Sequence, residues 1–74
     1  MPVATPKPRL DFTPLRQVRE RRGWSQKELA NKAGMHMATL NRIEKNWTEP
    51  PLAKVFALAR ALGVPADRLY TVAE

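Results

Sequence analysis

Apolar side chains recur every three or four residues over most of the chain, which is the spacing of one face of an α-helix. The pattern predicts five helices, at about 14–22, 26–32, 37–45, 52–62 and 66–70. The positions expected to face inward are Leu15, Val18, Leu29, Ala30, Met35, Leu40, Ile43, Leu52, Val55, Leu58, Ala59, Leu62, Val64 and Leu69. We therefore expect an all-α fold, a compact five-helix bundle.

The segment from Ser25 to Asn46 carries the clearest start and stop signals. Ser25 and Glu28 have the spacing of a capping box, in which each side chain binds the backbone N–H of the other residue. Gly34 supplies the positive φ of a sharp helix stop, and Asn46 can adopt the same left-handed conformation. The segment is therefore expected to form two short helices joined by a tight turn.

The remaining helices have weaker boundary signals. Thr13 is the expected N-cap of the first helix, because Pro14 suits the first helical position, and Gly23 should end this helix. Two prolines at 50–51 stop regular structure ahead of the fourth helix, which should end at Gly63.

The same segment resembles the helix-turn-helix of the phage-repressor and Cro-like (XRE-type) family of bacterial transcription factors. The resemblance covers about Leu15 to Tyr70 and implies a lambda-repressor-like DNA-binding domain whose third helix, about 37–45, enters the major groove. The residues that carry it are Ser25-Gln26, Glu28-Leu29-Ala30, Gly34, Thr39, Arg42-Ile43-Glu44, Pro50, Leu52, Leu62-Gly63-Val64 and Leu69.

The resemblance also implies roles for individual side chains. In related repressors, residues matching Arg19 and Glu44 form a partly buried ion pair that joins the first helix to the third. A glutamine at the position of Gln26 contacts the DNA backbone, in the first turn of a helix whose free N–H groups attract phosphate. His36 stands where relatives have a serine or threonine cap, so we expect it to be an imperfect cap or a phosphate contact.

The outer face of the third predicted helix is expected to meet the bases. Met37 and Ala38 stand where relatives often have polar side chains that hydrogen-bond to the bases. Being apolar, they are expected to contact thymine methyl groups instead. Arg42 is expected to bind guanine or only a phosphate or nearby carboxylate, and Asn41 to read adenine or a phosphate. The expected base contacts are Met37, Ala38, Asn41 and Arg42, and the expected phosphate contacts are Gln26, Lys27, His36, Lys45, Asn46 and Trp47. For Trp47, packing over the core is an equal alternative.

Charge agrees with a nucleic-acid partner. The net charge of +6 lies entirely within residues 1–48, which hold ten of the 13 Lys and Arg and four of the seven Asp and Glu. The proline-rich residues 1–12 are expected to form a flexible basic arm, from which Leu10 and Phe12 could pack back onto the domain, followed by the DNA-binding domain at 13–74. The alternative interpretation of this charge is a surface that keeps the protein soluble, without a nucleic-acid partner.

Other classes of function have little support. The chain has no cysteine and only one histidine, so we expect no metal site and no cofactor. It has no nucleophile–base constellation or phosphate loop, which argues against an enzyme. No apolar run could span a bilayer and no secretory signal is recognisable, so the expected compartment is the cytoplasm.

The sequence thus predicts a sequence-specific regulator of transcription that binds duplex DNA, most simply a repressor. Two alternatives of the same class are an antitoxin, which would also bind a toxin, and a restriction–modification controller protein. A coactivator-like protein-interaction module is the alternative of another class. A homodimer could form through Phe56, Tyr70 and the C-terminal tail.

Overall fold

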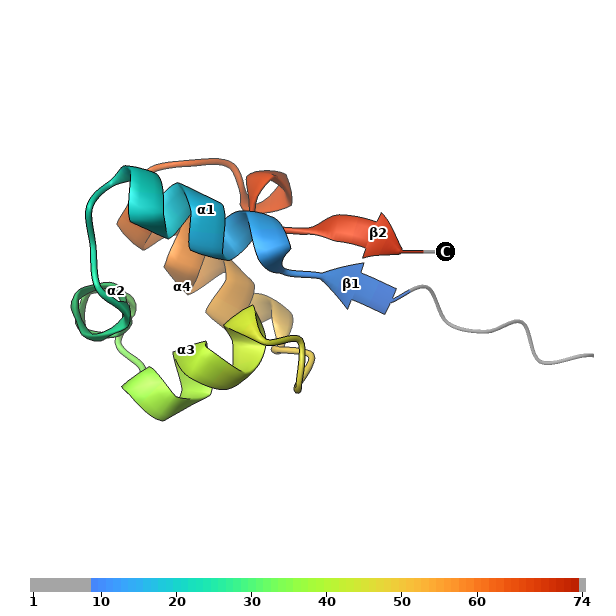
Figure 1. The fold of residues 1–74 in the computed structure, drawn as a ribbon, viewed down its shortest axis with the longest axis horizontal. Coiled ribbons are helices and arrows are strands. Elements are labelled where there is room, and N and C mark those ends of the chain that lie inside the picture. Colours follow the sequence, from blue (N-terminus) through green and yellow to red (C-terminus); the bar gives the residue numbers. More distant parts are fainter. Residues whose placement is uncertain (1–8, 74) are drawn as a thin grey trace, which may run out of the picture.

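The computed structural model describes residues 9–73. Within this range the chain forms four α-helices, one 3₁₀ turn and a two-stranded antiparallel sheet (Figure 1). The elements are β1 (Arg9–Asp11), α1 (Thr13–Arg21), α2 (Gln26–Ala33), α3 (Met37–Glu44), α4 (Leu52–Leu62), η1 (Ala66–Arg68) and β2 (Thr71–Ala73). The fold is a mostly helical helix-turn-helix domain.

The five-helix count is wrong, because the fifth predicted helix is a single 3₁₀ turn. Pro65 holds an extended backbone (φ −61°, ψ 146°) immediately before η1, so only Ala66–Arg68 are helical. The next residue, Leu69, is fully buried. The chain then becomes extended at Thr71, where the backbone groups of β2 find partners in β1.

The predicted arm of residues 1–12 differs from the structure at residues 9–12, and residues 1–8 lie outside the described range. β1 pairs with β2 in the register Arg9↔Ala73, Leu10↔Val72 and Asp11↔Thr71. Phe12 is 1% exposed, and its ring centroid lies 5.8 Å from that of Tyr70. Burial of this aromatic ring draws the preceding residues into the folded domain, which proline content alone does not reveal.

The core is a contiguous cluster from all four helices, with Phe12 before α1 and Leu69 after η1. Its buried apolar residues are Phe12, Leu15, Leu29, Ala30, Leu40, Ile43, Val55, Leu58, Ala59, Leu62 and Leu69. The prediction that Leu52 faces the core is wrong, since 64% of its surface is exposed. It is the first residue of α4, directly after the N-cap Pro51, and the buried stripe of this helix begins one turn later at Val55.

The helix ends agree with the expectations around the turn but not at α1. The Ser25 hydroxyl accepts a hydrogen bond from the Glu28 N–H (3.1 Å), and the Glu28 carboxylate accepts one from the Ser25 N–H (3.2 Å), so the capping box is confirmed. Gly34 has the expected left-handed conformation (φ 70°). Thr13 is not the N-cap of α1; Phe12 has that position, and the Asp11 carboxylate accepts the Thr13 N–H instead (2.9 Å).

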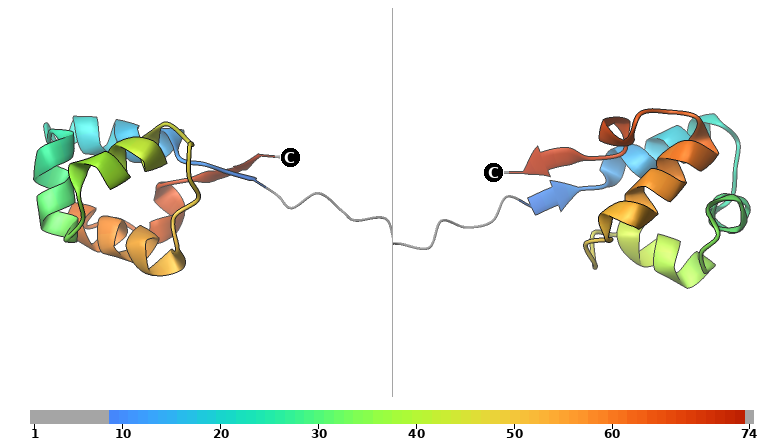
Figure 2. Two further views of the ribbon diagram at one scale, coloured as in Figure 1. Left: turned by 90° about the horizontal axis from the view of Figure 1, so that it is seen from below. Right: turned by 180° about the vertical axis from the view of Figure 1, so that it is seen from behind.

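The arrangement leaves α3 at the edge of the bundle. In Figure 1, α1 and α4 lie above α3, α2 is seen end-on at one side, and no element lies below α3. The views of Figure 2 agree that β1 and β2 extend away from the helices at the end opposite α2. The outer face of α3 is therefore free of other elements of the described chain.

Candidate nucleic-acid interface

The outer face of α3 brings together most of the predicted base contacts. Met37, which is 51% exposed, begins the helix, and Ala38 and Arg42 are also exposed. The opposite face buries Leu40 and Ile43 in the core. Because this packing holds α3 against the domain, its exposed side chains form a rigid row that can enter a groove of nucleic acid.

His36 occupies the N-cap position of α3, but its side chain makes no capping hydrogen bond. His36 is therefore an imperfect cap, which is one of its two predicted roles. Its side chain is exposed, immediately before the first turn of α3. Phosphate contact, the other predicted role, stays a prediction.

Glu44 lies on the inner side of α3 and forms an ion pair with Arg19 of α1. The guanidinium donates from Nε to Oε2 at 2.7 Å and from Nη2 to Oε1 at 2.9 Å, while Nη1 donates to the backbone carbonyl of Trp24 at 2.8 Å. The two side chains are only 10% and 3% exposed. The hydrogen bonds that Arg19 donates to Glu44 raise the pKa of Arg19 above its ordinary value. The pair joins α1 to α3 and fixes the position of α3 against α1.

Gln26 and Asn41 continue this network to the surface. Gln26 Nε2 donates to Glu44 Oε1 at 3.1 Å, and Asn41 Nδ2 donates to Gln26 Oε1 at 3.2 Å. Both side chains are half-buried. Two residues predicted to contact DNA separately, one on α2 and one on α3, are thus hydrogen-bonded to each other. We call Arg19, Glu44, Gln26 and Asn41 the polar relay.

The family resemblance predicted the Arg19–Glu44 pair, but sequence reasoning missed the hydrogen bonds of Gln26 and Asn41, although one signal for them was present. Asn41 and Glu44 stand three residues apart on α3 and therefore lie on neighbouring turns of the same side. A buried carboxylate requires hydrogen-bond donors oriented toward it. The contact to Gln26 depends on how α2 crosses α3, which the sequence pattern does not state.

Asn46 has a structural role beyond its predicted one. Its backbone is left-handed (φ 59°), as expected at the end of α3. Its Oδ1 accepts the Phe12 N–H at 2.8 Å, and its Nδ2 donates to the Asp11 carboxylate at 3.0 Å. Hydrogen bonds from Thr13, and then from Asn46, lower the pKa of Asp11 below 3.8. Asn46 therefore links the end of α3 to the start of α1.

Cationic and aromatic side chains flank α3 at both ends. Lys27 is exposed in the first turn of α2. Trp47 is 71% exposed, so it does not pack over the core. The Lys45 ammonium lies 4.5 Å from the centroid of the Trp47 ring, within the range of a cation–π interaction. These residues place positive charge and N–H donors next to the exposed face of α3.

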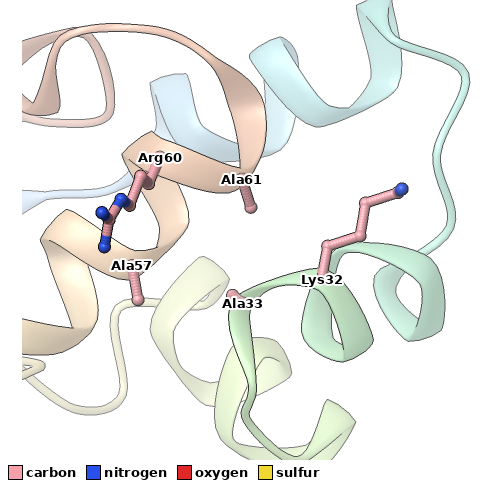
Figure 3. Close-up of a pocket in the computed structure, with 5 residues that line it drawn as sticks. All are labelled: Lys32, Ala33, Ala57, Arg60 and Ala61. Atoms are coloured by element: carbon pink, nitrogen blue, oxygen red, sulfur yellow. The ribbon is translucent and has the colours of Figure 1, made fainter.

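Pockets of the described chain offer no comparable site. A shallow groove of about 370 Å³ between α2 and α4 is lined by Lys32, Ala33, Ala57, Arg60 and Ala61. Figure 3 shows the two basic side chains pointing away from each other, with the alanines between them. Residues 9–73 contain no group of three His, Asp or Glu side chains that could hold a metal ion, and none of their helices is long and apolar enough to cross a bilayer.

Comparison with known families matches this geometry. The sequence profile HTH_3, described as "Helix-turn-helix", matches residues 15–69, which include α1 to α4. The chain belongs to this family. HTH_3 is the Cro/C1-type (XRE-type) group, so the predicted family is confirmed. HTH_3 proteins are DNA-binding regulators, not enzymes.

Two curated relatives of this HTH_3 domain come from Escherichia coli (strain K12). The HTH-type transcriptional regulator SutR is 42% identical over 53 residues, which are 72% of this chain and 30% of SutR. The antitoxin HipB is 35% identical over 48 residues, which are 65% of this chain and 54% of HipB. The chain thus spans about a third and about half of the lengths of these relatives.

Two solved structures have folds similar to that of this chain. The restriction–modification controller protein C.AhdI from Aeromonas hydrophila has a TM-score of 0.76 and 28% identity, covering 78% of this chain and 88% of C.AhdI. SinR, a master regulator for biofilm formation solved in complex with DNA, has a TM-score of 0.73 and 32% identity, covering 78% of this chain and 94% of the SinR chain.

Proposed function

We propose that this chain binds duplex DNA sequence-specifically and regulates transcription, most simply as a repressor that occupies an operator. The likeness to SinR, a structure solved with DNA, is the observation that carries this proposal. The exposed face of α3 and the basic residues beside it supply a positively charged surface on which DNA could bind. Such a regulator would act where bacterial DNA lies, in the cytoplasm.

In this proposal α3 enters the major groove and phosphate contacts flank it on both sides. Met37 and Ala38 would pack on thymine methyl groups, and Arg42 would bind the O6 and N7 acceptors of guanine. Gln26, Lys27 and His36 would hold the phosphates near the start of α3, and Lys45 and Trp47 those near its end. Asn46 is the weakest of the phosphate contacts, because its amide is already bound to Asp11 and to the backbone of Phe12.

A symmetric homodimer would fit an operator that is an inverted repeat, with half-sites about 34 Å apart. Two large apolar side chains are available for such an interface, since Phe56 and Val72 are 54% and 58% exposed. Tyr70 is half-buried against Phe12 and would contribute only its outer edge.

Two alternative roles are suggested by individual relatives. HipB is an antitoxin, so a toxin is a candidate protein partner for this chain. C.AhdI is a restriction–modification controller, so control of such a system is the other candidate. The coactivator-like alternative would leave Met37 and Ala38 as a protein contact and would not require DNA.

The experiment that tests the proposal is selection of bound sequences from random duplexes, with wild type and Arg42→Ala. We expect wild type to select a defined motif with an affinity that falls steeply with salt. Arg42→Ala should lose the preference for guanine at one position of that motif, while a uniform loss of affinity would make Arg42 a phosphate contact. Failure of the wild-type protein to select any motif would refute sequence-specific binding and favour the protein-interaction alternative.

A further inference from the structure

The negative charge of Glu44 determines which atom donates and which accepts in each hydrogen bond of the polar relay. Both Glu44 oxygens accept from Arg19, and a carboxylate of this kind can only accept hydrogen bonds. The Gln26 amide must therefore turn its Nε2 toward Glu44, as it does at 3.1 Å. The opposite orientation would place an amide oxygen against a carboxylate oxygen, which is repulsive.

This orientation of Gln26 determines the orientation of Asn41. With Nε2 bound to Glu44, the atom that Gln26 presents to Asn41 is its Oε1, an acceptor. Asn41 meets it with an N–H, at 3.2 Å. The Asn41 amide is thereby oriented with Nδ2 toward Gln26, which engages one of its two N–H groups. Its Oδ1, the single acceptor of the amide, has no partner inside the relay. Asn41 is half-buried, which leaves part of its amide accessible from outside.

We propose that the polar relay makes Asn41 a specificity-determining residue that presents a hydrogen-bond acceptor to the bases. This inference rests on the proposed binding of α3 in the major groove. In that groove an acceptor is matched by the exocyclic amino group of adenine (N6) or cytosine (N4). The keto oxygens of guanine and thymine are themselves acceptors, so Asn41 Oδ1 should avoid them.

Gln26 acquires a second role in this arrangement. Besides its expected phosphate contact, it is a positioning residue, because it transmits the polarity of Glu44 to Asn41. An amide freed from the relay could turn over and present either its oxygen or its N–H group. Removal of Gln26 should therefore relax the choice between amino and keto groups, in addition to weakening the binding.

The test replaces single functional groups of the DNA. The base pair read by Asn41 is first identified as the one whose selection changes in Asn41→Ala. Every base pair carries one amino and one keto group in the major groove, so two duplexes are compared at this pair. One has its adenine or cytosine replaced by the analogue that lacks the amino group, and the other has its thymine or guanine replaced by the analogue that lacks the keto oxygen.

For the wild-type protein we expect loss of the amino group to weaken binding about ten-fold, and loss of the keto oxygen to change it by less than about two-fold. Asn41→Ala should not distinguish the duplexes. Gln26→Ala should bind all duplexes more weakly and reduce the ten-fold ratio to about two-fold. Lys27→Ala is the matched control, because it removes a neighbouring phosphate contact outside the relay and should keep the full ratio.

Two results would overturn the inference while leaving DNA binding intact. One is a larger loss on removal of the keto oxygen than of the amino group. The other is an unchanged ratio in Gln26→Ala, with the melting temperatures of all variants showing that they are folded. If no duplex is selected in the first place, the proposed function fails rather than the relay.

Discussion

The Glu44 carboxylate accepts two hydrogen bonds from the Arg19 guanidinium, at 2.7 and 2.9 Å, in a site where both side chains are nearly inaccessible to water. This contact spans 25 residues of sequence and joins the first helix of the domain to the proposed recognition helix. The same carboxylate also accepts a bond from Gln26. Stability and the orientation of the reading face therefore depend on one buried group.

Replacing Glu44 with alanine should strongly destabilise the domain. The change leaves the Arg19 guanidinium buried without its counter-ion, which typically costs about 3–5 kcal/mol. For a domain of this size the melting temperature should fall by more than about 10 °C, measured by circular dichroism. Glu20→Ala is the matched control, because it breaks the Arg16–Glu20 pair, whose side chains are 63% and 55% exposed, and should change stability by less than about 0.5 kcal/mol. Equal effects of the two changes would contradict the structural role of the buried pair.

The two contributions of Asn46 can be separated by substitution. Asn46→Gly keeps the left-handed backbone but loses the bonds to Asp11 and Phe12, and should cost about 1–2 kcal/mol in free energy of unfolding. Asn46→Ala loses the same bonds and should cost about 1 kcal/mol more, because a Cβ disfavours positive φ. Denaturant unfolding measures both. A glycine variant as stable as wild type would show that the side-chain bonds contribute nothing.

Gly34 should be replaceable only at the cost of backbone strain. A Cβ added there meets no atom within 4 Å, but φ is +70°. Gly34→Ala should therefore lose about 1–2 kcal/mol through conformation alone, and Gly34→Asn should lose less, because asparagine visits the left-handed region more readily. The comparison is made by thermal unfolding of the two variants. Equal stabilities of the alanine and asparagine variants would argue against strain as the cause.

Asp11 should make part of the stability depend on pH in acid. Its pKa is lowered below 3.8 in the folded state by hydrogen bonds from Thr13 and Asn46, so the unfolded chain takes up the proton first as pH falls. The contribution is complete above pH 3.8 and is lost as pH falls through the folded-state pKa. Asp11→Asn should be less stable than wild type at neutral pH, and this difference in the free energy of unfolding, the gap, should shrink in this acid range. Unfolding curves of both proteins across the range measure the gap, and a constant gap would contradict the linkage.

Lys27 should contribute one phosphate contact to DNA binding. Lys27→Ala should reduce the slope of log affinity against log salt by about one and weaken binding to all sequences alike. Arg68→Ala removes the same charge from η1, which lies away from α3 in Figure 1, and should leave the slope unchanged. Fluorescence anisotropy at several salt concentrations distinguishes them. Equal slopes for the two variants would place Lys27 outside the interface.

Local chemistry made much of this fold predictable. The capping box of Ser25 and Glu28 and the left-handed Gly34 depend on residues close together in sequence, so their pattern indicated α2 and its turn before any packing was known. The bounds predicted for α4 were also correct, because Gly63 ends the helix through its own backbone freedom. The predicted pairing of Arg19 with Glu44 instead came from family resemblance.

Long-range contacts decided what the sequence pattern did not show. Proline content marked residues 1–12 as an arm, yet burial of Phe12 and pairing with residues 71–73 make residues 9–12 part of the domain. Strand pairing of this kind depends on a partner about sixty residues away and leaves little trace in so short a segment.

The sequence by itself determined the helix-turn-helix and the residues available on its outer face, because capping, turn formation and helical periodicity act within a few residues. Only the tertiary structure decided how those residues are oriented. The crossing of α2 and α3 brings Gln26 between Glu44 and Asn41, and the charge of Glu44 then sets the direction of each amide. Hydrogen-bond polarity is a property of the assembled network, so no single residue in the sequence could reveal it.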